Sequence, residues 1–128
     1  MKLLLDTVTF LDAAFSSTDI STRARDLLLK EDSELFLSIA SCWEIAIKYS
    51  IGRLALPQSP EKFVPVHRAK IGAEILPIDE ESTFHLTRLP HIHQDPFDRI
   101  LICQAITHGM VLVTPDERIA RYPVRTAW

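Results

Sequence analysis

The chain has 128 residues, of which 47% are hydrophobic and 24% are charged, and its formal net charge is -3. This length predicts one domain over residues 1–128, and the composition is that of an ordinary soluble globular protein. The negative charge excludes a strongly basic nucleic-acid footprint, although a metal-dependent nuclease needs acids at its centre and cations only at its rim. Cys42 and Cys103 form no C-x-x-C motif, and there is no signal peptide or long apolar run, so we expect a cytoplasmic protein without a membrane partner.

Apolar periodicity predicts an alternation of strands and helices along the chain. The first strand, residues 2–6, contains consecutive leucines, as in a strand covered on both faces, and Asp6 closes it. By itself, Asp6 is explained as a turn residue or helix cap as well as a site acid. In chain order, the further predicted elements are helices over 9–15 and 21–30, a strand over 35–37, helices over 41–49 and 61–70 with a break near Pro65, a strand over 74–76, helices over 80–89 and 96–108, a strand over 111–113, a helix over 117–121 and an edge strand over 124–128.

The predicted helix over 41–49 carries one acid. Ser41 and Glu44 form the S-x-x-E pattern of a capping box, which places Glu44 in the first helical turn. That pattern explains the residue structurally, but a first-turn carboxylate can cap with one oxygen and face a cleft with the other. Lys48 follows Glu44 by four residues, which predicts an ion pair worth about 0.3 kcal/mol.

Local signals are clearest around the predicted helix over 96–108. Asp95 suits the N-cap and Pro96 suits the first helical position, where the missing N–H of proline is not needed. Asp98 then falls at the third helical position, in the first turn. A glycine ends the helix, and the buried strand that follows stops at Thr114-Pro115-Asp116.

Strands that alternate with helices predict an α/β fold, in which a parallel sheet has helices on both faces. Ligands of such sheets bind at the carboxyl ends of the strands, where the strand order reverses. Asp6 and Asp116 end strands, whereas Glu44 and Asp98 open helices at the same edge. Each acid alone has a structural explanation, but their joint placement predicts an acidic site.

Three sequence blocks carry a resemblance to a known family. They are LLLDT at the start, S-x-x-S-x-WEIAIK in the middle, and DPFDR-I-L-I-x-QA followed by LVTPDE. Together they resemble PIN-domain ribonucleases, and in particular the VapC-type toxins of type II toxin–antitoxin systems. The resemblance covers nearly the whole chain and implies a three-layer α/β/α fold with a central parallel sheet of four to five strands, in a single PIN-like domain.

The resemblance also implies a metal-dependent endoribonuclease whose catalytic and metal-binding residues are Asp6, Glu44, Asp98 and Asp116, with Asp95 mainly as a helix cap. Carboxylate oxygens are the hard ligands that Mg²⁺ or Mn²⁺ takes, and such an ion neutralises a phosphate and favours in-line attack by water. The implied partners are an RNA substrate, a cognate antitoxin protein and a second copy of the chain in a homodimer.

Four side chains beside the acids are candidate contacts to substrate: Thr7, Arg99, Thr114 and Arg118. The threonines could orient water or a carboxylate, and ordinary turn hydrogen bonds explain them equally well. The arginines could hold the phosphodiester backbone, and solvated helix surface is their structural explanation. Val8 departs from the family pattern, because relatives often carry His or Asn at that position.

Other function classes stay open. Val8 is compatible with a non-catalytic PIN-like binding module. An acidic-site phosphohydrolase or a receiver domain fits poorly, since the phosphatase type needs a second Asp at position 8 and the receiver type needs an Asp at the end of a middle strand, where Ser38 stands. His91 and His93 form an H-x-H that would suit a zinc or manganese phosphodiesterase, but no other His or Cys has ligand spacing to them, so we expect residues of a surface loop.

Overall fold

The computed structural model describes all 128 residues and alternates strands with helices, as the sequence predicts. The strands are β1 (Lys2–Leu5), β2 (Glu34–Ser38), β3 (Ala73–Leu76), β4 (Val111–Val113) and β5 (Thr126–Ala127). The helices are α1 (Thr7–Ala14), α2 (Thr22–Leu29), α3 (Ile39–Ser50), α4 (Pro60–Ile71), α5 (Glu80–His85) with a following 3₁₀ turn, α6 (Pro96–His108) and α7 (Glu117–Ala120). No helix combines the length and the hydropathy that crossing a membrane requires.

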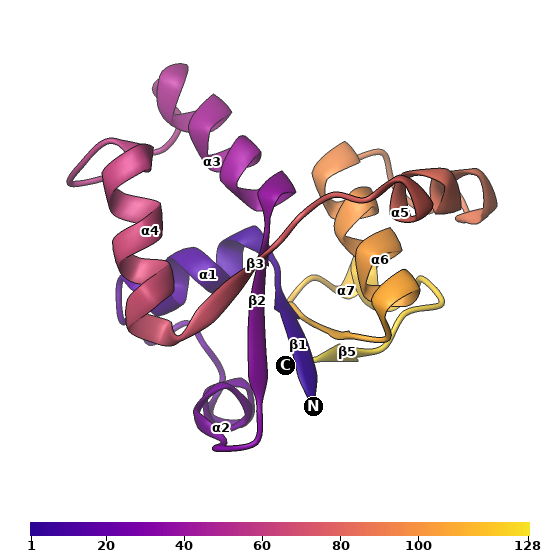
Figure 1. Cartoon of the computed structure of the whole chain (residues 1–128), viewed down its shortest axis with the longest axis horizontal. Coiled ribbons are helices and arrows are strands. Elements are labelled where there is room, and N and C mark those ends of the chain that lie inside the picture. Colours follow the sequence, from indigo (N-terminus) through magenta and orange to yellow (C-terminus); the bar gives the residue numbers. More distant parts are fainter.

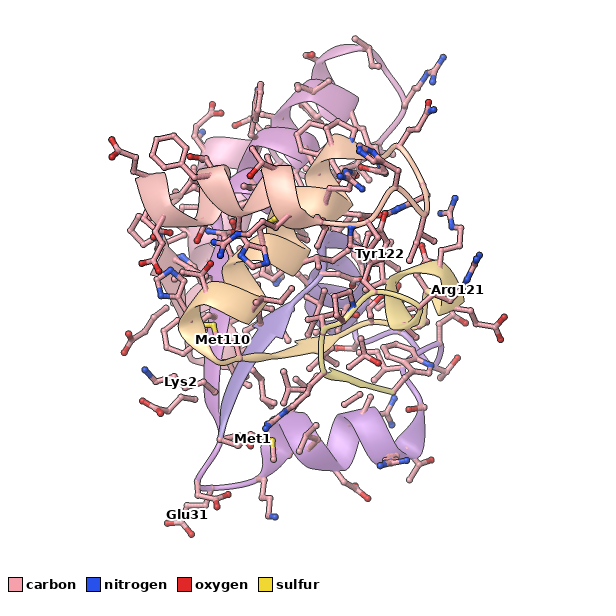
Figure 2. The ribbon with its side chains drawn as sticks, turned by 90° about the vertical axis from the view of Figure 1, so that its right-hand side faces the viewer. Met1, Lys2, Glu31, Met110, Arg121 and Tyr122 are labelled. Atoms are coloured by element: carbon pink, nitrogen blue, oxygen red, sulfur yellow. The ribbon has the colours of Figure 1, made fainter.

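The five strands form one parallel sheet in the order β3-β2-β1-β4-β5, which agrees with the predicted sheet. The chain first builds outward from β1 through β2 to β3, and then returns to place β4 on the other side of β1. The strand order therefore reverses between β1 and β4, and a ligand crevice is expected at the carboxyl ends of these strands. Met1 and Lys2 mark the opposite, N-terminal edge of the sheet (Figure 2).

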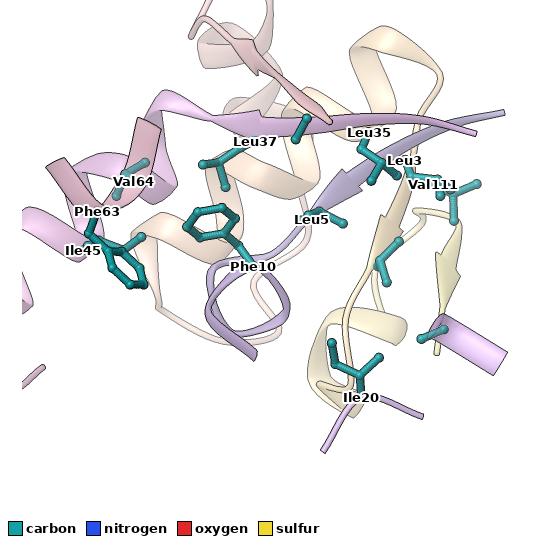
Figure 3. Close-up of a cluster of buried hydrophobic side chains, with 13 residues drawn as sticks. Leu3, Leu5, Phe10, Ile20, Leu35, Leu37, Ile45, Phe63, Val64 and Val111 are labelled. Carbon is teal, nitrogen blue, oxygen red and sulfur yellow. The ribbon is translucent and has the colours of Figure 1, made fainter. Parts of the chain in front are cut away.

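Helices cover both faces of the sheet and make three layers, with α1 and α4 on one side and α5 and α6 on the other (Figure 1). Successive side chains of a strand point to opposite faces. Leu3 and Leu5 accordingly join the cluster beneath α1, α2 and α4, where Phe10 lies in the interior (Figure 3). Leu4 joins the second cluster, which α6 and α7 cover. Burying each such leucine contributes roughly 1.5–3 kcal/mol to folding.

Two helices begin earlier than periodicity predicts, because a capping side chain stands at the end of the preceding strand. Asp6 caps α1, accepting a hydrogen bond from the Thr9 N–H at 2.7 Å, so this helix starts at Thr7. Ser38 caps α3 in the same way, accepting from the Ala40 N–H at 3.0 Å. The predicted capping box is therefore wrong: Glu44 lies in the second turn of α3.

Two further differences concern helix interiors. Pro65 does not break α4, which runs on to Ile71. The proline gives up only the hydrogen bond to the carbonyl of Glu61, an exposed residue at which water can take its place. In α3, Trp43 is 60% exposed whereas Ile45 is fully buried, since residues two positions apart point about 200° apart around a helix.

Candidate active site

A hollow of about 290 Å³ lies at the carboxyl ends of β1 and β4, where the strand order reverses. It brings together the four acids that the sequence singles out, although they come from four separate segments. Its lining residues are Asp6, Thr7, Val8, Glu44, Lys48, Asp95, Asp98, Pro115, Asp116 and Arg118. Two larger hollows lie elsewhere, and neither collects more than one carboxylate.

One oxygen of Asp6 caps α1, and the residue also lines the hollow. The Thr9 hydroxyl donates to the Val113 carbonyl at 3.0 Å, which holds the start of α1 against the end of β4. Burial raises the pKa of Asp6 above its usual value, and the charge of Glu44 adds to this rise, while hydrogen bonds from Thr114 and Thr9 oppose it. No positively charged side chain forms an ion pair with the Asp6 carboxylate.

Both oxygens of Glu44 are held by protein groups. The Thr7 hydroxyl is 2.6 Å from Oε1, and Lys48 Nζ forms an ion pair with Oε2 at 2.5 Å. Thr7 Oγ1 also lies 3.0 Å from Ser41 Oγ. Because a hydroxyl has one proton, Thr7 donates to Glu44 and accepts from Ser41. Thr7 therefore orients this carboxylate, and the side chain of Lys48 neutralises it.

Asp98 is the most strongly perturbed acid of the hollow. Burial raises its pKa to about 6; a hydrogen bond from His93 opposes the shift, and the charges of Asp95 and Glu44 reinforce it. His93 Nε2 lies 3.1 Å from Asp98 Oδ2. Asp95 is the N-cap of α6, as the sequence predicts. Its Oδ1 accepts hydrogen bonds from the N–H groups of Phe97 at 2.9 Å and Asp98 at 3.1 Å.

Asp116 closes the hollow at its more exposed side. It caps α7 by accepting from the Arg118 N–H at 2.8 Å, and the Arg118 guanidinium pairs with Oδ2 at 3.0 Å. These hydrogen bonds and the positive charge lower the pKa of Asp116 below its usual value. The Thr114 hydroxyl accepts from the Asp116 N–H at 3.1 Å and so shapes the turn after β4.

Arg99 does not line the hollow, where its expected contact with a substrate phosphate would be made. It is only 9% exposed, and it donates to the Pro90 carbonyl at 2.8 Å and to the Tyr122 hydroxyl at 3.0 Å instead of lining the hollow. Nη1 thus serves internal hydrogen bonds, and this position does not support the expected contact to phosphate. Val8, which is 53% exposed, does line the hollow and brings no polar atom to it.

His93 contacts one of the four acids, and the sequence analysis did not predict this contact. Its side chain is 6% exposed, against the expectation of a surface loop, and it contacts Asp98 and Tyr122. His91 is exposed, as expected. The spacing of five residues to Asp98 was visible in the sequence, but the contact depends on Tyr122, which is distant along the chain.

The acids fit a divalent cation by their chemistry, although no three acid, His or Cys side chains converge tightly enough to hold an ion as they stand. Instead, Lys48 holds Glu44 and Arg118 holds Asp116. Both cations are long, exposed side chains that can rotate away. The donor set is carboxylate oxygen throughout, which is what Mg²⁺ and Mn²⁺ take. Burial, with a smaller contribution from neighbouring carboxylates, raises the pKa values of Asp6 and Asp98, and a cation in the hollow would favour their charged forms.

Known proteins share this sequence pattern and fold. A family model described as the PIN domain matches residues 3–125. Ribonuclease VapC16 from Mycobacterium tuberculosis is 32% identical over 69 residues, which are 54% of this chain and 49% of that protein. The chain thus spans about half the length of this curated relative.

Two solved structures illustrate the shared fold. VapBC2 from Rickettsia felis, bound to a DNA fragment from its promoter, has a TM-score of 0.74 at 16% identity, over 99% of this chain and 98% of that chain. DNA-bound VapBC from Salmonella typhimurium has a TM-score of 0.69 at 21% identity, over 99% of this chain and 97% of that chain. At these identities the likeness is one of fold, and it agrees with the predicted three-layer architecture.

Proposed function

Because this chain belongs to the PIN-domain family, we propose that it is a metal-dependent endoribonuclease and the toxin of a toxin–antitoxin pair. The observation that carries the proposal is the meeting of Asp6, Glu44, Asp98 and Asp116 at the point where the strand order reverses. The likeness to a protein named as a ribonuclease supports the reaction, and the likeness to VapBC structures supports the toxin role.

The four acids would hold Mg²⁺ or Mn²⁺. When bound, the ion supplies positive charge that neutralises the scissile phosphate and favours attack by water. Thr7 fixes one oxygen of Glu44, and the cap by Asp95 fixes the first turn of α6, from which Asp98 projects. If Glu44 and Asp116 held a divalent ion, the side chains of Lys48 and Arg118 would be free to pair with phosphate oxygens of RNA at the rim of the hollow.

The proposal includes an antitoxin protein as partner, a homodimer and a cytoplasmic location. A group of carboxylates that is short of cations attracts an Arg or Lys from a partner, and an Arg fork can bridge two carboxylates. An inserted cation of this kind would compete with the divalent ion for Asp6 and Asp98. The antitoxin would then inhibit cleavage by pairing with the same carboxylates that would bind the divalent ion.

A second candidate is a PIN-like binding module that no longer cleaves. Val8 favours it, because this exposed side chain leaves the rim beside Asp6 without the polar group that relatives often carry. Cleavage separates the two functions, since a binding module retains partners but does not increase the number of RNA ends.

The test is RNA cleavage by the purified, antitoxin-free protein with Mg²⁺ or Mn²⁺, beside the same reaction with EDTA and a reaction with Asp6→Asn to detect contaminating nucleases. We expect cleavage that EDTA and the substitution both abolish, and that the co-encoded partner suppresses. Cleavage undiminished by EDTA would contradict the metal mechanism, and no cleavage with either ion would favour the binding module.

A further inference from the structure

One oxygen of Asp98 is held by the protein and the other is left free. His93 Nε2 lies 3.1 Å from Oδ2, and Oδ1 has no hydrogen-bond partner in the protein. The His93 side chain is nearly buried, while Asp98 lines the hollow. The carboxylate is thus presented with one oxygen fixed, which is how outer partners orient the ligands of metal sites.

Tyr122 determines which nitrogen of His93 carries the proton. Its hydroxyl lies 3.0 Å from Arg99 Nη1, 3.0 Å from the His93 backbone N–H and 2.7 Å from His93 Nδ1. The guanidinium and the backbone N–H can only donate, and they occupy both accepting positions of the phenol oxygen. The phenol proton has two acceptors within reach, His93 Nδ1 at 2.7 Å and the His93 carbonyl at 3.3 Å, and the much shorter contact assigns it to Nδ1. The imidazole then carries its own proton on Nε2 and donates a hydrogen bond to Asp98.

Arg99 sets the direction of this chain of hydrogen bonds. It is always protonated, and it is held by the Pro90 carbonyl and by Tyr122, whose ring lies 5.9 Å from its guanidinium carbon. Each member then donates to the next, from Arg99 through Tyr122 and His93 to Asp98. Tyr122 is buried in the C-terminal segment, whereas its neighbour Arg121 is exposed (Figure 2).

We propose that His93 is a positioning residue for Asp98, fixed in its Nε2–H form by Tyr122 and Arg99, so that the free oxygen of Asp98 meets a divalent cation in the hollow. This rests on the proposed function for the nature of the ion. It gives Arg99 a role inside the protein in place of a contact to RNA. The Asp98 carboxylate is therefore oriented by two segments of the chain: His93 lies in the loop before α6, and Tyr122 lies after α7.

Two substitutions at His93 separate positioning from general stability. In His93→Gln, the amide nitrogen reaches the place of Nε2 and can donate to Asp98. In His93→Asn, the shorter side chain keeps a polar atom near Nδ1 and Tyr122 but brings nothing to Asp98. The outer partners of metal ligands are worth roughly 10- to 100-fold in affinity. We expect His93→Asn to weaken Mn²⁺ binding by roughly that factor, and His93→Gln to restore most of it.

The measurement is calorimetric titration of Mn²⁺ into the full chain, with melting temperatures recorded for every variant. His108→Asn is the matched control, because His108 Nε2 makes the same kind of contact with Asp79 at 3.0 Å outside the hollow; its Mn²⁺ affinity should equal that of the wild type. Equal losses in the Asn and Gln variants, wild-type affinity in His93→Asn, or no Mn²⁺ binding by the wild type would each overturn the positioning role. If the wild type binds Mn²⁺ and His93→Gln restores the affinity that His93→Asn loses, the positioning role of His93 stands. An absence of RNA cleavage would then refute the proposed function but not this positioning role.

Discussion

Asp98→Asn and Asp6→Asn are expected to reduce RNA cleavage by roughly 100- to 1,000-fold, the usual effect of removing one group that stabilises charge in a transition state. Asparagine keeps the shape of each side chain and an oxygen that accepts the existing hydrogen bond, from His93 to residue 98 and from the Thr9 N–H to residue 6. The negative charge is lost, and an amide NH₂ group replaces the second carboxylate oxygen. The metal-free protein should therefore stay as stable as the wild type or become more stable, because a buried charge is removed and repulsion from Glu44 is relieved.

The pH dependence of stability sharpens this expectation for Asp98. Its folded-state pKa of about 6 lies above the ordinary 3.8, so the fold favours the protonated form. That stabilisation is fully present below pH 3.8 and is lost as the pH rises through about 6. After allowance for solvent screening at the open hollow, we expect the metal-free wild type to lose about 1–2 kcal/mol relative to Asp98→Asn over this interval.

The measurements are RNA cleavage with Mn²⁺ and thermal melting without metal between pH 4 and 7. Glu117→Gln is the control, since Glu117 is an exposed acid that follows Asp116 directly but does not line the hollow. It should leave both cleavage and the melting curves unchanged. A clear loss of metal-free stability in Asp6→Asn and Asp98→Asn, with cleavage retained, would show that these acids serve the fold alone.

Gln104→Met is expected to destabilise the protein by about 2–3 kcal/mol and to lower the melting temperature by roughly 10 °C. Gln104 has no exposed surface, and it accepts from the Ser38 hydroxyl at 2.6 Å and donates to the Pro77 carbonyl at 3.0 Å. These bonds tie α6 to the ends of β2 and β3. Because Ser38 also caps α3, Gln104 connects the helix that carries Asp98 to the helix that carries Glu44.

A double-mutant cycle with Ser38→Ala distinguishes a lost hydrogen bond from a general packing defect. Ser38→Ala alone should cost about 1 kcal/mol for the helix cap, in addition to leaving the amide of Gln104 with one partner fewer. When both partners are removed, the combined loss should be smaller than the sum of the single losses by about 1 kcal/mol or more. Additive losses would mean that this hydrogen bond does not couple α6 to α3.

Sequence signals predicted the elements best where cap residues are unambiguous. The Asp95-Pro96 pair and Gly109 set both ends of α6, and the apolar run after it is β4. At α3 two serines compete for the cap, and Ser38 at the end of β2 takes the place that Ser41 was expected to fill. Glu44 still lies at the carboxyl edge of the sheet, as predicted, because it lines the hollow from the second turn of α3 instead of the first.

The environment of the candidate site was less predictable, because it depends on residues far apart in the chain. Nothing local to His93 or Arg99 indicates that both meet the hydroxyl of Tyr122, more than 20 residues further on. The same holds for Thr7, whose contact with Glu44 spans 37 positions. Periodicity shows which side chains face inward, but partners of buried polar groups are set by how the segments pack, which one sequence does not display.

Titration of Mn²⁺ into the metal-free protein tests most directly whether Asp6, Glu44, Asp98 and Asp116 form one cation site. The four variants are Asp6→Asn, Glu44→Gln, Asp98→Asn and Asp116→Asn, with Glu117→Gln as the matched surface control. We expect binding by the wild type and the control, and affinity lowered by roughly 10-fold or more in all four variants while each keeps its melting transition. Wild-type affinity in the four variants would contradict a shared site for the acids.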